Sequence, residues 1–173
     1  MYSVYKNADK KQIKNVYFMK KLVITLVLSC LFAVNSMAQE IYKEVVNMKA
    51  DVERVMNDTT LNIETRKIAC FKNDALYYLL ERASEEEMFS EYLLGSQANA
   101  MIDFVNLYVK RLAAEKKKKN KDIIMATFKN ASTAKPLFDD PDKELVYGYV
   151  DNDKYITQFS IDTDWEKALK AVK

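Results

Sequence analysis

The sequence predicts an all-α fold: an antiparallel helical bundle of about four to six helices with a C-terminal helical pair packed on it. Three observations indicate this fold class. Apolar side chains recur every three or four residues along several long segments, which is the period of an amphipathic helix. Only two glycines and two prolines occur in 173 residues, too few for the many tight turns of a β-sandwich. The good helix formers Ala, Leu, Glu, Lys and Met are abundant.

The segment 19–38 is expected to be a secretory signal peptide. It begins with two lysines after its methionine, continues with an apolar run of 13 residues and ends in the small residues Ser36 and Ala38. This order of charge, apolar core and small-x-small site is typical of exported proteins. A membrane-spanning helix needs about 20 apolar residues, so the run is too short for an anchor. We therefore expect cleavage between Ala38 and Gln39, and no transmembrane span in the mature chain.

Two features of the N-terminal region bear on this prediction. Residues 1–18 are basic and unpatterned, and because a signal peptide normally begins near its charged residues, we expect Met19 to be the true start. The segment ending in Cys30 resembles a lipobox, the site at which a bacterial lipoprotein is cleaved and acylated on cysteine. The apolar run continues past Cys30, where a lipoprotein turns polar. Soluble export is therefore favoured, with a lipoprotein anchored at Cys30 as the alternative, and residues 39–173 are expected to form a single helical domain.

The composition excludes several classes of function. There is no histidine, which excludes Ser-His-Asp and Cys-His catalysis and every histidine-containing metal site. Two glycines cannot build a Gly-rich phosphate loop, and no cofactor is expected. Once the leader is removed, Cys70 has no cysteine to pair with. The 38 leader residues hold six Lys and one Asp, so the net charge falls from +2 to −3 on their removal, and no nucleic-acid partner is expected.

Three long helices are expected before the first cluster of lysines. The first covers residues 40–57, the second about 62–83, and the third runs from Ser84, which precedes three glutamates, to about Ala114. Their apolar stripes are, in chain order, Ile41, Val45, Met48, Val52 and Val55; Ile68, Phe71, Ala75, Tyr78 and Arg82; and Leu94, Ala98, Met101, Val105, Tyr108 and Leu112. The second stripe is widened by Leu76, Leu79, Leu80 and Ala83. Its helix should therefore have neighbours on two sides.

Gly95 lies near the start of the third stripe. It predicts either a kink or a boundary between a short helix and a long one. The small residues Ser96, Ala98 and Ala100 beside it predict that another helix comes close.

The rest of the chain is expected to hold shorter helices. The third stripe ends at Glu115, and the lysines 116–119 suit a helix C-terminus. A fourth helix should begin at Ile123 and give way to a loop over 131–136.

The C-terminal tail is expected to hold a helical pair. The first helix should span 140–149, and the segment 155–161 is rich in β-forming residues but too short to assign. Residues 163–166 match a capping box, which predicts a final helix over 164–172 that docks through Trp165.

A basic turn is the first candidate site. Residues 110–129 carry eight basic and two acidic side chains, which is typical of a site for phospholipid or another anion. The candidate anion-binding residues are Lys116, Lys117, Lys118, Lys119 and Lys121. No aromatic residue is interleaved with these lysines, so base recognition is not indicated. A solvated helix end is the interpretation that this charge run favours, with anion binding as the alternative.

The acidic tail is the second candidate site. Asp140, Asp142, Glu144 and Asp151 match the spacing of positions 1, 3, 5 and 12 of a calcium loop. Leu145 stands where such a loop needs glycine, which favours a helix with solvating acids instead. Residues 139–166 carry nine acidic and two basic side chains, so this tail and the basic turn should attract each other.

These observations favour a non-catalytic exported protein of the bacterial envelope or periplasm that acts through a surface. Its partner would be another envelope protein or a second copy of the chain. Acidic residues are plentiful, so a small carboxylate-dependent hydrolase is one alternative, although spacing alone brings no two carboxylates together. Most tyrosines and the single tryptophan fall on helical stripes, which indicates core packing rather than a binding surface.

Overall fold

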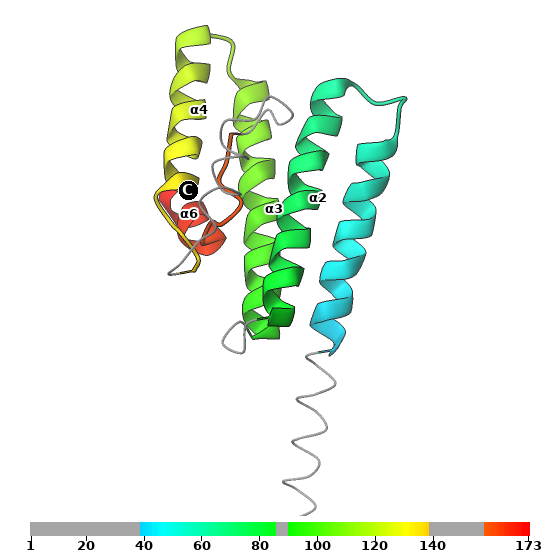
Figure 1. Ribbon diagram of the computed structural model, residues 1–173. Helices are drawn as coiled ribbons and strands as arrows, with labels where there is room; N and C mark the ends of the chain where they lie inside the picture. The colour runs from blue at the N-terminus through cyan, green and yellow to red at the C-terminus, as the bar shows by residue number, and fades with distance from the viewer. Residues whose placement is uncertain (1–38, 86–89, 139–157) are drawn as a thin grey trace, which may run out of the picture. The chain divides into compact units, whose positions relative to one another are not determined.

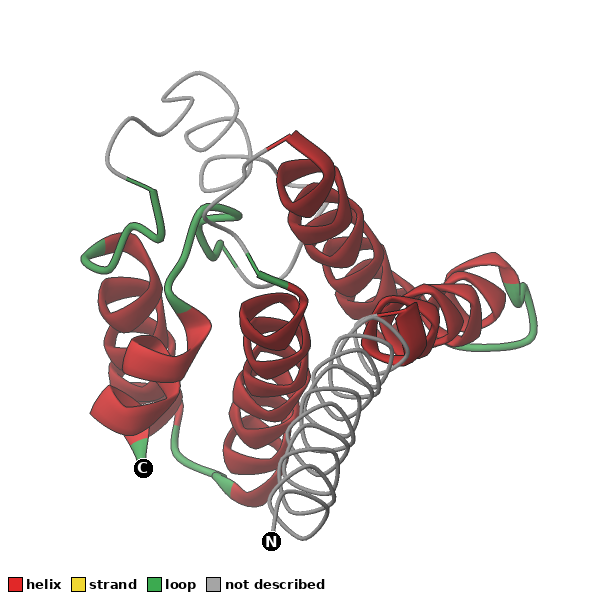
Figure 2. Ribbon diagram, turned by 90° about the horizontal axis from the view of Figure 1, so that it is seen from below, coloured by secondary structure: helices red, strands yellow, loops and turns green. Residues whose placement is uncertain are grey.

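The computed structural model describes residues 39–85, 90–138 and 158–173. Residues 39–57 form the first helix, followed by α2 (Ile63–Glu85), α3 (Glu91–Ala114), α4 (Lys118–Thr133) and α6 (Trp165–Val172). Within the described residues every regular element is a helix, as Figure 2 shows, and Pro136 and Thr163 form an isolated bridge. The all-α fold class is therefore confirmed. None of the described helices is long and apolar enough to span a membrane.

The predicted stripes face the core. Residues 41–173 form one unit, in which the first four helices alternate in direction (Figure 1). Phe71, Ala75 and Tyr78 of the α2 stripe are buried together with its widening leucines, as predicted for a helix with neighbours on two sides, whereas Ile68 and Arg82 are half-buried. The stripe of α3 is buried from Leu94 to Tyr108. In the first helix Val45 is buried, whereas Val55 is exposed.

The predicted start of the third helix at Ser84 is wrong. Ser84 lies inside α2, where its hydroxyl donates to the Glu81 carbonyl at 2.6 Å. Ser90 is the N-cap of α3 instead, and its hydroxyl accepts the Leu93 N–H at 3.3 Å. Both serines precede acidic residues, and a serine inside a helix can satisfy its hydroxyl with the carbonyl one turn back. The local sequence therefore allows a helix start at Ser84 as well as at Ser90.

The fourth helix begins earlier and ends later than predicted. α3 ends at Ala114 as expected, but α4 already begins at Lys118, so Lys118 and Lys119 lie in its first turn rather than at the C-terminus of α3. A lysine near a helix N-terminus costs only about 0.3–1 kcal/mol, and the good helix propensity of lysine opposes that cost. The helix continues to Thr133, so the loop expected over 131–136 begins at Ala134.

Gly95 marks the close approach of two helices. A Cβ built at this position would lie 2.8 Å from the Cγ2 atom of Ile41, too close for an ordinary contact. The absence of a Cβ at Gly95 therefore lets the first helix pack against the start of α3, as the small residues beside Gly95 predicted. α3 is continuous through Gly95, so the expected helix boundary at this glycine is wrong.

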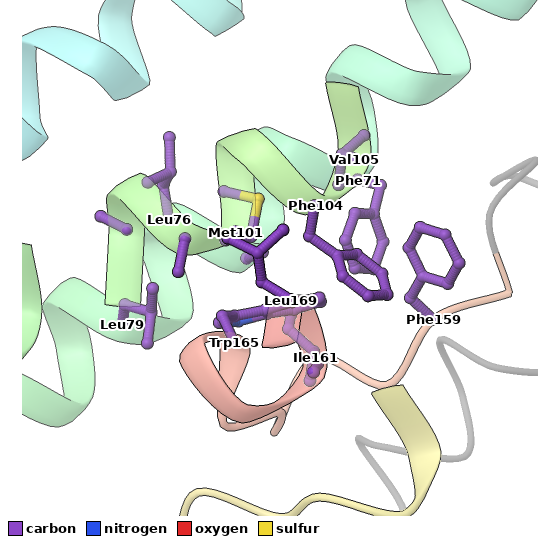
Figure 3. Close-up of a cluster of buried hydrophobic side chains, with 14 of the residues drawn as sticks. Phe71, Leu76, Leu79, Met101, Phe104, Val105, Phe159, Ile161, Trp165 and Leu169 are labelled. Atoms are coloured by element: carbon purple, nitrogen blue, oxygen red, sulfur yellow. The ribbon is translucent and has the colours of Figure 1, made fainter. Parts of the chain in front are cut away.

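The described end of the C-terminal tail, residues 158–173, contributes side chains to the core rather than packing on the outside of the bundle. Phe159 and Trp165 are fully buried and contact the rings of Phe71 and Phe104 (Figure 3). The ring centroids of Phe159 and Tyr108 are 5.0 Å apart in an edge-to-face arrangement, a favourable geometry for aromatic pairs. The last helix docks through Trp165 as predicted, but it forms part of the core. Its expected partner over 140–149 lies outside the described residues.

Candidate functional site

A buried polar cluster joins α3 to the start of α6. The Gln97 side chain is 1% exposed, accepts the Trp165 backbone N–H at 2.6 Å and donates to Asp164 Oδ1 at 3.1 Å. Asp164 also accepts the Lys167 N–H at 3.1 Å and pairs with the Lys167 ammonium at 2.8 Å. Burial pushes the pKa of Asp164 upward, but the bonds from Lys167 and Gln97 outweigh it and hold the pKa below its usual value.

The predicted capping box lies at the start of α6 as expected, but a different residue is the N-cap. Asp164, not Thr163, is the N-cap of α6, and its carboxylate accepts the Lys167 N–H. The Thr163 hydroxyl lies within hydrogen-bonding distance of two carbonyls, those of Ser132 at 3.0 Å and Ser160 at 2.6 Å. Thr163 therefore ties the buried segment to the end of α4 instead of capping the helix.

A second buried carboxylate lies between α2 and the loop after α4. Asp162 is 2% exposed, and its Oδ1 atom accepts the Tyr78 hydroxyl at 3.4 Å. Burial raises the pKa of Asp162, although the Tyr78 hydroxyl, the charge of Arg82 and the N–H groups of Phe138 and Leu137 offset part of the rise. The Arg82 guanidinium stacks on the Phe138 ring, 4.2 Å from its centroid.

These two carboxylates are held by structural contacts. Asp164 fixes the start of α6 and Asp162 fixes the segment before it to α2. Neither lines the two hollows described below. A catalytic carboxylate pair needs a space for substrate between its members.

The structure describes only some of the residues that were predicted as metal ligands or as a modified cysteine. Among the described residues no three His, Cys, Asp or Glu side chains gather as a metal site. The calcium candidates Asp140, Asp142, Glu144 and Asp151 lie outside the described residues, as does Cys30. Cys70 is a half-buried free cysteine of α2.

An apolar groove lies where α2 begins, α3 ends and α4 begins, at the end of the bundle that is uppermost in Figure 1. It has a volume of ≈ 480 Å³. Its apolar lining consists of Ile68, Tyr108, Val109, Leu112, Ala113 and Met125. Its charged lining consists of Glu64, Lys118, Lys121 and Asp122, two acids and two bases. We call these ten residues the apolar groove.

Helical spacing explains this lining. The α4 members, Lys118, Lys121, Asp122 and Met125, recur at intervals of 3, 1 and 3 and so share one helical face. Tyr108 is almost fully buried and forms part of the base of the groove, whereas Met125 is 39% exposed at the opening.

A smaller hollow adjoins the apolar groove. It has a volume of ≈ 330 Å³ and lies among the first helix, α2 and α3. Its lining consists of Val52, Val55, Thr65, Ile68, Ala69, Lys72, Asn106, Val109 and Lys110. We call these nine residues the lysine hollow, because the set contains two lysines and no acidic residue. Ile68 of α2 and Val109 of α3 line both spaces, so they form a wall that the two hollows share.

Lys72 is the notable cation of the lysine hollow. Its ammonium donates to Asn106 Oδ1 at 2.7 Å, across the interface of α2 and α3. Burial lowers the pKa of Lys72, and no carboxylate of the described residues forms an ion pair with it. A half-buried ammonium with no counter-ion among the described residues would be stabilised by an incoming anion.

The structure brings only part of the predicted basic turn to these hollows. Lys118 and Lys121 line the apolar groove, beside the acids Glu64 and Asp122. Lys116, Lys117 and Lys119 are exposed and line neither hollow. The turn is shaped by Glu115, whose Oε1 atom accepts the N–H groups of Lys116 and Lys117, each at 2.8 Å. Anion binding by this turn stays a prediction.

Sequence reasoning did not find the lysine hollow. Lys72 and Asn106 are 34 residues apart, and neither belongs to a motif. Lys72 lies four residues after Ile68 and four before Leu76, so it falls on the widened apolar face of α2. A lysine on an apolar face was therefore the sequence signal that could have pointed to this position.

Comparison with protein-family models, curated proteins and solved structures found no match to the chain.

Proposed function

We propose that the protein is an exported, non-catalytic binding protein of the bacterial envelope or periplasm, and that it holds a small ligand in the apolar groove. The observation that carries this proposal is the groove itself, with its volume of ≈ 480 Å³ and mostly apolar lining. Binding sites for small molecules typically have volumes of about 300–1,000 Å³, apolar walls and a few polar groups.

Two further observations support a binding role over a catalytic one. The buried carboxylates Asp162 and Asp164 are engaged in contacts that hold the tail in the core. The chain also has no histidine to act as a general base near neutral pH. Export is supported by the signal-peptide pattern of residues 19–38.

Binding can be tested with a fluorescent dye that has apolar aromatic rings and one sulfonate, 1-anilinonaphthalene-8-sulfonate, and with a variant that fills the groove. Ala113 lines the groove and is exposed, so Ala113→Trp should add bulk to the groove without disturbing the core. Ala126→Trp is the matched control, because Ala126 is exposed on α4 and lines neither hollow. We expect saturable binding of one dye per folded chain, weakened at least about tenfold by the first variant and unchanged by the second.

The binding proposal fails if the folded protein takes up no dye, or if both tryptophan variants bind it as the parent does. Near-ultraviolet circular dichroism of each variant should match the parent, because loosened proteins also bind such dyes. Export is tested separately by mass spectrometry of the mature N-terminus from an envelope fraction. A chain that begins at Gln39 supports it, whereas an acylated Cys30 places the protein on a membrane.

A further inference from the structure

We infer that the ligand of the apolar groove is an uncharged, mostly apolar molecule with an oxygen that accepts a hydrogen bond, as a ketone has, and that the Tyr108 hydroxyl donates to this oxygen. The whole molecule lies in the apolar groove. This inference rests on the proposed binding function and adds the chemistry of the ligand.

The Tyr108 hydroxyl is the group that indicates an acceptor. Tyr108 is 1% exposed, and its hydroxyl makes no hydrogen bond with any described residue. Its side chain contacts rings instead, with centroids 5.3 Å from that of Phe128 and 5.0 Å from that of Phe159. Within the part of the chain that the structure describes, the Trp165 Nε1 atom is sealed without a partner, whereas the Tyr108 hydroxyl is not sealed. Because Tyr108 lines the apolar groove, a ligand there can reach this hydroxyl.

Tyr108 offers a proton rather than a charge. Burial raises the pKa of Tyr108, so the phenol stays protonated at neutral pH. A tyrosine hydroxyl in buried surroundings normally has a hydrogen-bond partner, because a polar group without one costs free energy. Tyr108 also has the only uncharged side chain among the ten groove residues that can donate a hydrogen bond. A bound molecule would therefore be oriented by its acceptor.

The charged residues of the apolar groove do not select an ion. They are two acids and two bases, so their charges cancel. Three of the four are exposed and only Lys121 is half-buried, so solvent screens most of them. An ion that moved into the groove would lose hydration without meeting a net opposite charge. A charged group, such as the sulfonate of the dye, would stay in water at the opening, whereas an uncharged molecule can bury its whole length.

The test uses two uncharged probes of the same shape, benzophenone and 1,1-diphenylethylene. They differ only in that a carbonyl oxygen of the first is a CH₂ group in the second. Tyr108→Phe removes the hydroxyl and keeps the ring, and Tyr77→Phe is the matched control at an exposed tyrosine that lines neither hollow. Equilibrium dialysis gives the Kd of each probe for each protein. Benzophenone-4-carboxylate adds a negative charge to the first probe.

We expect one benzophenone to bind per chain of the parent. The Kd of 1,1-diphenylethylene divided by that of benzophenone should fall at least about fivefold from the parent to Tyr108→Phe, because a hydrogen bond is typically worth about that factor. The two probes differ in hydrophobicity, but this difference cancels when the same ratio is compared between two proteins. Tyr77→Phe should keep the ratio of the parent. Ala113→Trp should weaken both probes, since both occupy the groove.

The infrared spectrum of bound benzophenone gives a second readout that does not depend on affinity. A hydrogen bond weakens the C=O bond, so the carbonyl stretch should lie at a lower frequency in the parent than in Tyr108→Phe. The variant should fold as the parent does, because it loses no hydrogen bond to a described residue. Near-ultraviolet circular dichroism checks this for each protein.

An unchanged ratio in Tyr108→Phe, or a carbonyl stretch at the same frequency in both proteins, would overturn the inference. Tighter binding of benzophenone-4-carboxylate than of benzophenone would overturn it too, because the groove would then select an anion. Each of these results leaves the binding proposal intact if Ala113→Trp still weakens the probes. Failure of both uncharged probes to bind would also overturn the inference, and failure of the dye as well would reject the proposed function itself.

Discussion

Replacing Gln97 with Glu should destabilise the protein strongly at neutral pH and much less in acid. The Gln97 amide is buried, with its oxygen on the Trp165 N–H and its nitrogen on Asp164 Oδ1 at 3.1 Å. A glutamate of the same shape keeps the first bond. Its second oxygen has no proton to donate at neutral pH and instead faces the Asp164 carboxylate.

Two effects set the size of the loss. A hydrogen bond to a charged group contributes about 1.5–3 kcal/mol, and this bond disappears. Two unit charges 4 Å apart repel by about 4 kcal/mol at an effective dielectric constant of 20, a cost that the protein limits by protonating one carboxyl. We expect a net loss of about 3–4 kcal/mol at pH 7.5, a large part of the 5–15 kcal/mol that typically separates folded and unfolded states.

The pH dependence gives the sharper test. Burial and the neighbouring Asp164 charge should raise the pKa of the introduced carboxyl above its unfolded value of about 4.3. Stability should therefore fall as the pH rises through the raised pKa and return as the pH falls through it. Urea unfolding at pH 7.5 and pH 4.5 measures both values. At the lower pH the protonated carboxyl at position 97 can again donate a hydrogen bond to the Asp164 carboxylate, as the amide does in the parent.

Asn99→Asp is the matched control for this experiment. Asn99 is exposed in the same helix, and its amide donates only to the Gly95 carbonyl at 3.0 Å. The same change from amide to carboxylate should cost less than about 1 kcal/mol there. Equal losses at positions 97 and 99, or a loss at Gln97 that does not change with pH, would refute the role assigned to the buried cluster.

Asp162→Asn should be at least as stable as the parent at pH 7, because burial raises the pKa of Asp162 and so disfavours its charged form. In melting curves the gain in stability should shrink toward pH 4, where Asp162 becomes protonated. A loss of stability that grows toward pH 7 would contradict this. Gly95→Ala should cost about 1 kcal/mol in urea unfolding through its clash with Ile41, but should gain about 0.5–1 kcal/mol in an Ile41→Ala background, where helix propensity decides. Trp165→Ala should lower the free energy of unfolding by about 3–5 kcal/mol, and the control Tyr92→Ala, at an exposed residue, should lower it by less than about 0.5 kcal/mol. Equal losses would show that the core does not depend on Trp165.

The helices of this protein could be predicted because their apolar periodicity is a local property. The stripe from Leu94 to Tyr108 is buried as expected, and so is the middle of the wide face of α2, from Phe71 to Leu80. The helix ends were less predictable, since Ser84 and Ser90 offer equivalent caps and only one is used. Which serine caps the helix depends on the length of α2 that the core can bury, and that is a tertiary property.

The burial of residues 158–165 in the core could not be predicted from local signals. The segment from Ser160 to Asp164 is mostly polar, which normally indicates an exposed loop, yet its side chains are buried. Their partners, Tyr78, Gln97 and the Ser132 carbonyl, come from three different helices. The candidate site was missed for the same reason, because its lining residues meet only after these helices have packed.

The central position of Phe159 and Trp165 also determines when the chain can fold during its synthesis. The helices up to residue 133 leave the ribosome before the two rings that fill the space between them. Until then Phe71, Phe104 and Tyr108 lack ring partners that they have in the finished core, so the early helices cannot reach native stability alone. Domains usually fold as they emerge, but this one must wait for residues 158–172. For a chain that is exported as proposed, this delay would keep the polypeptide loose enough to be threaded through a translocation channel before its core closes.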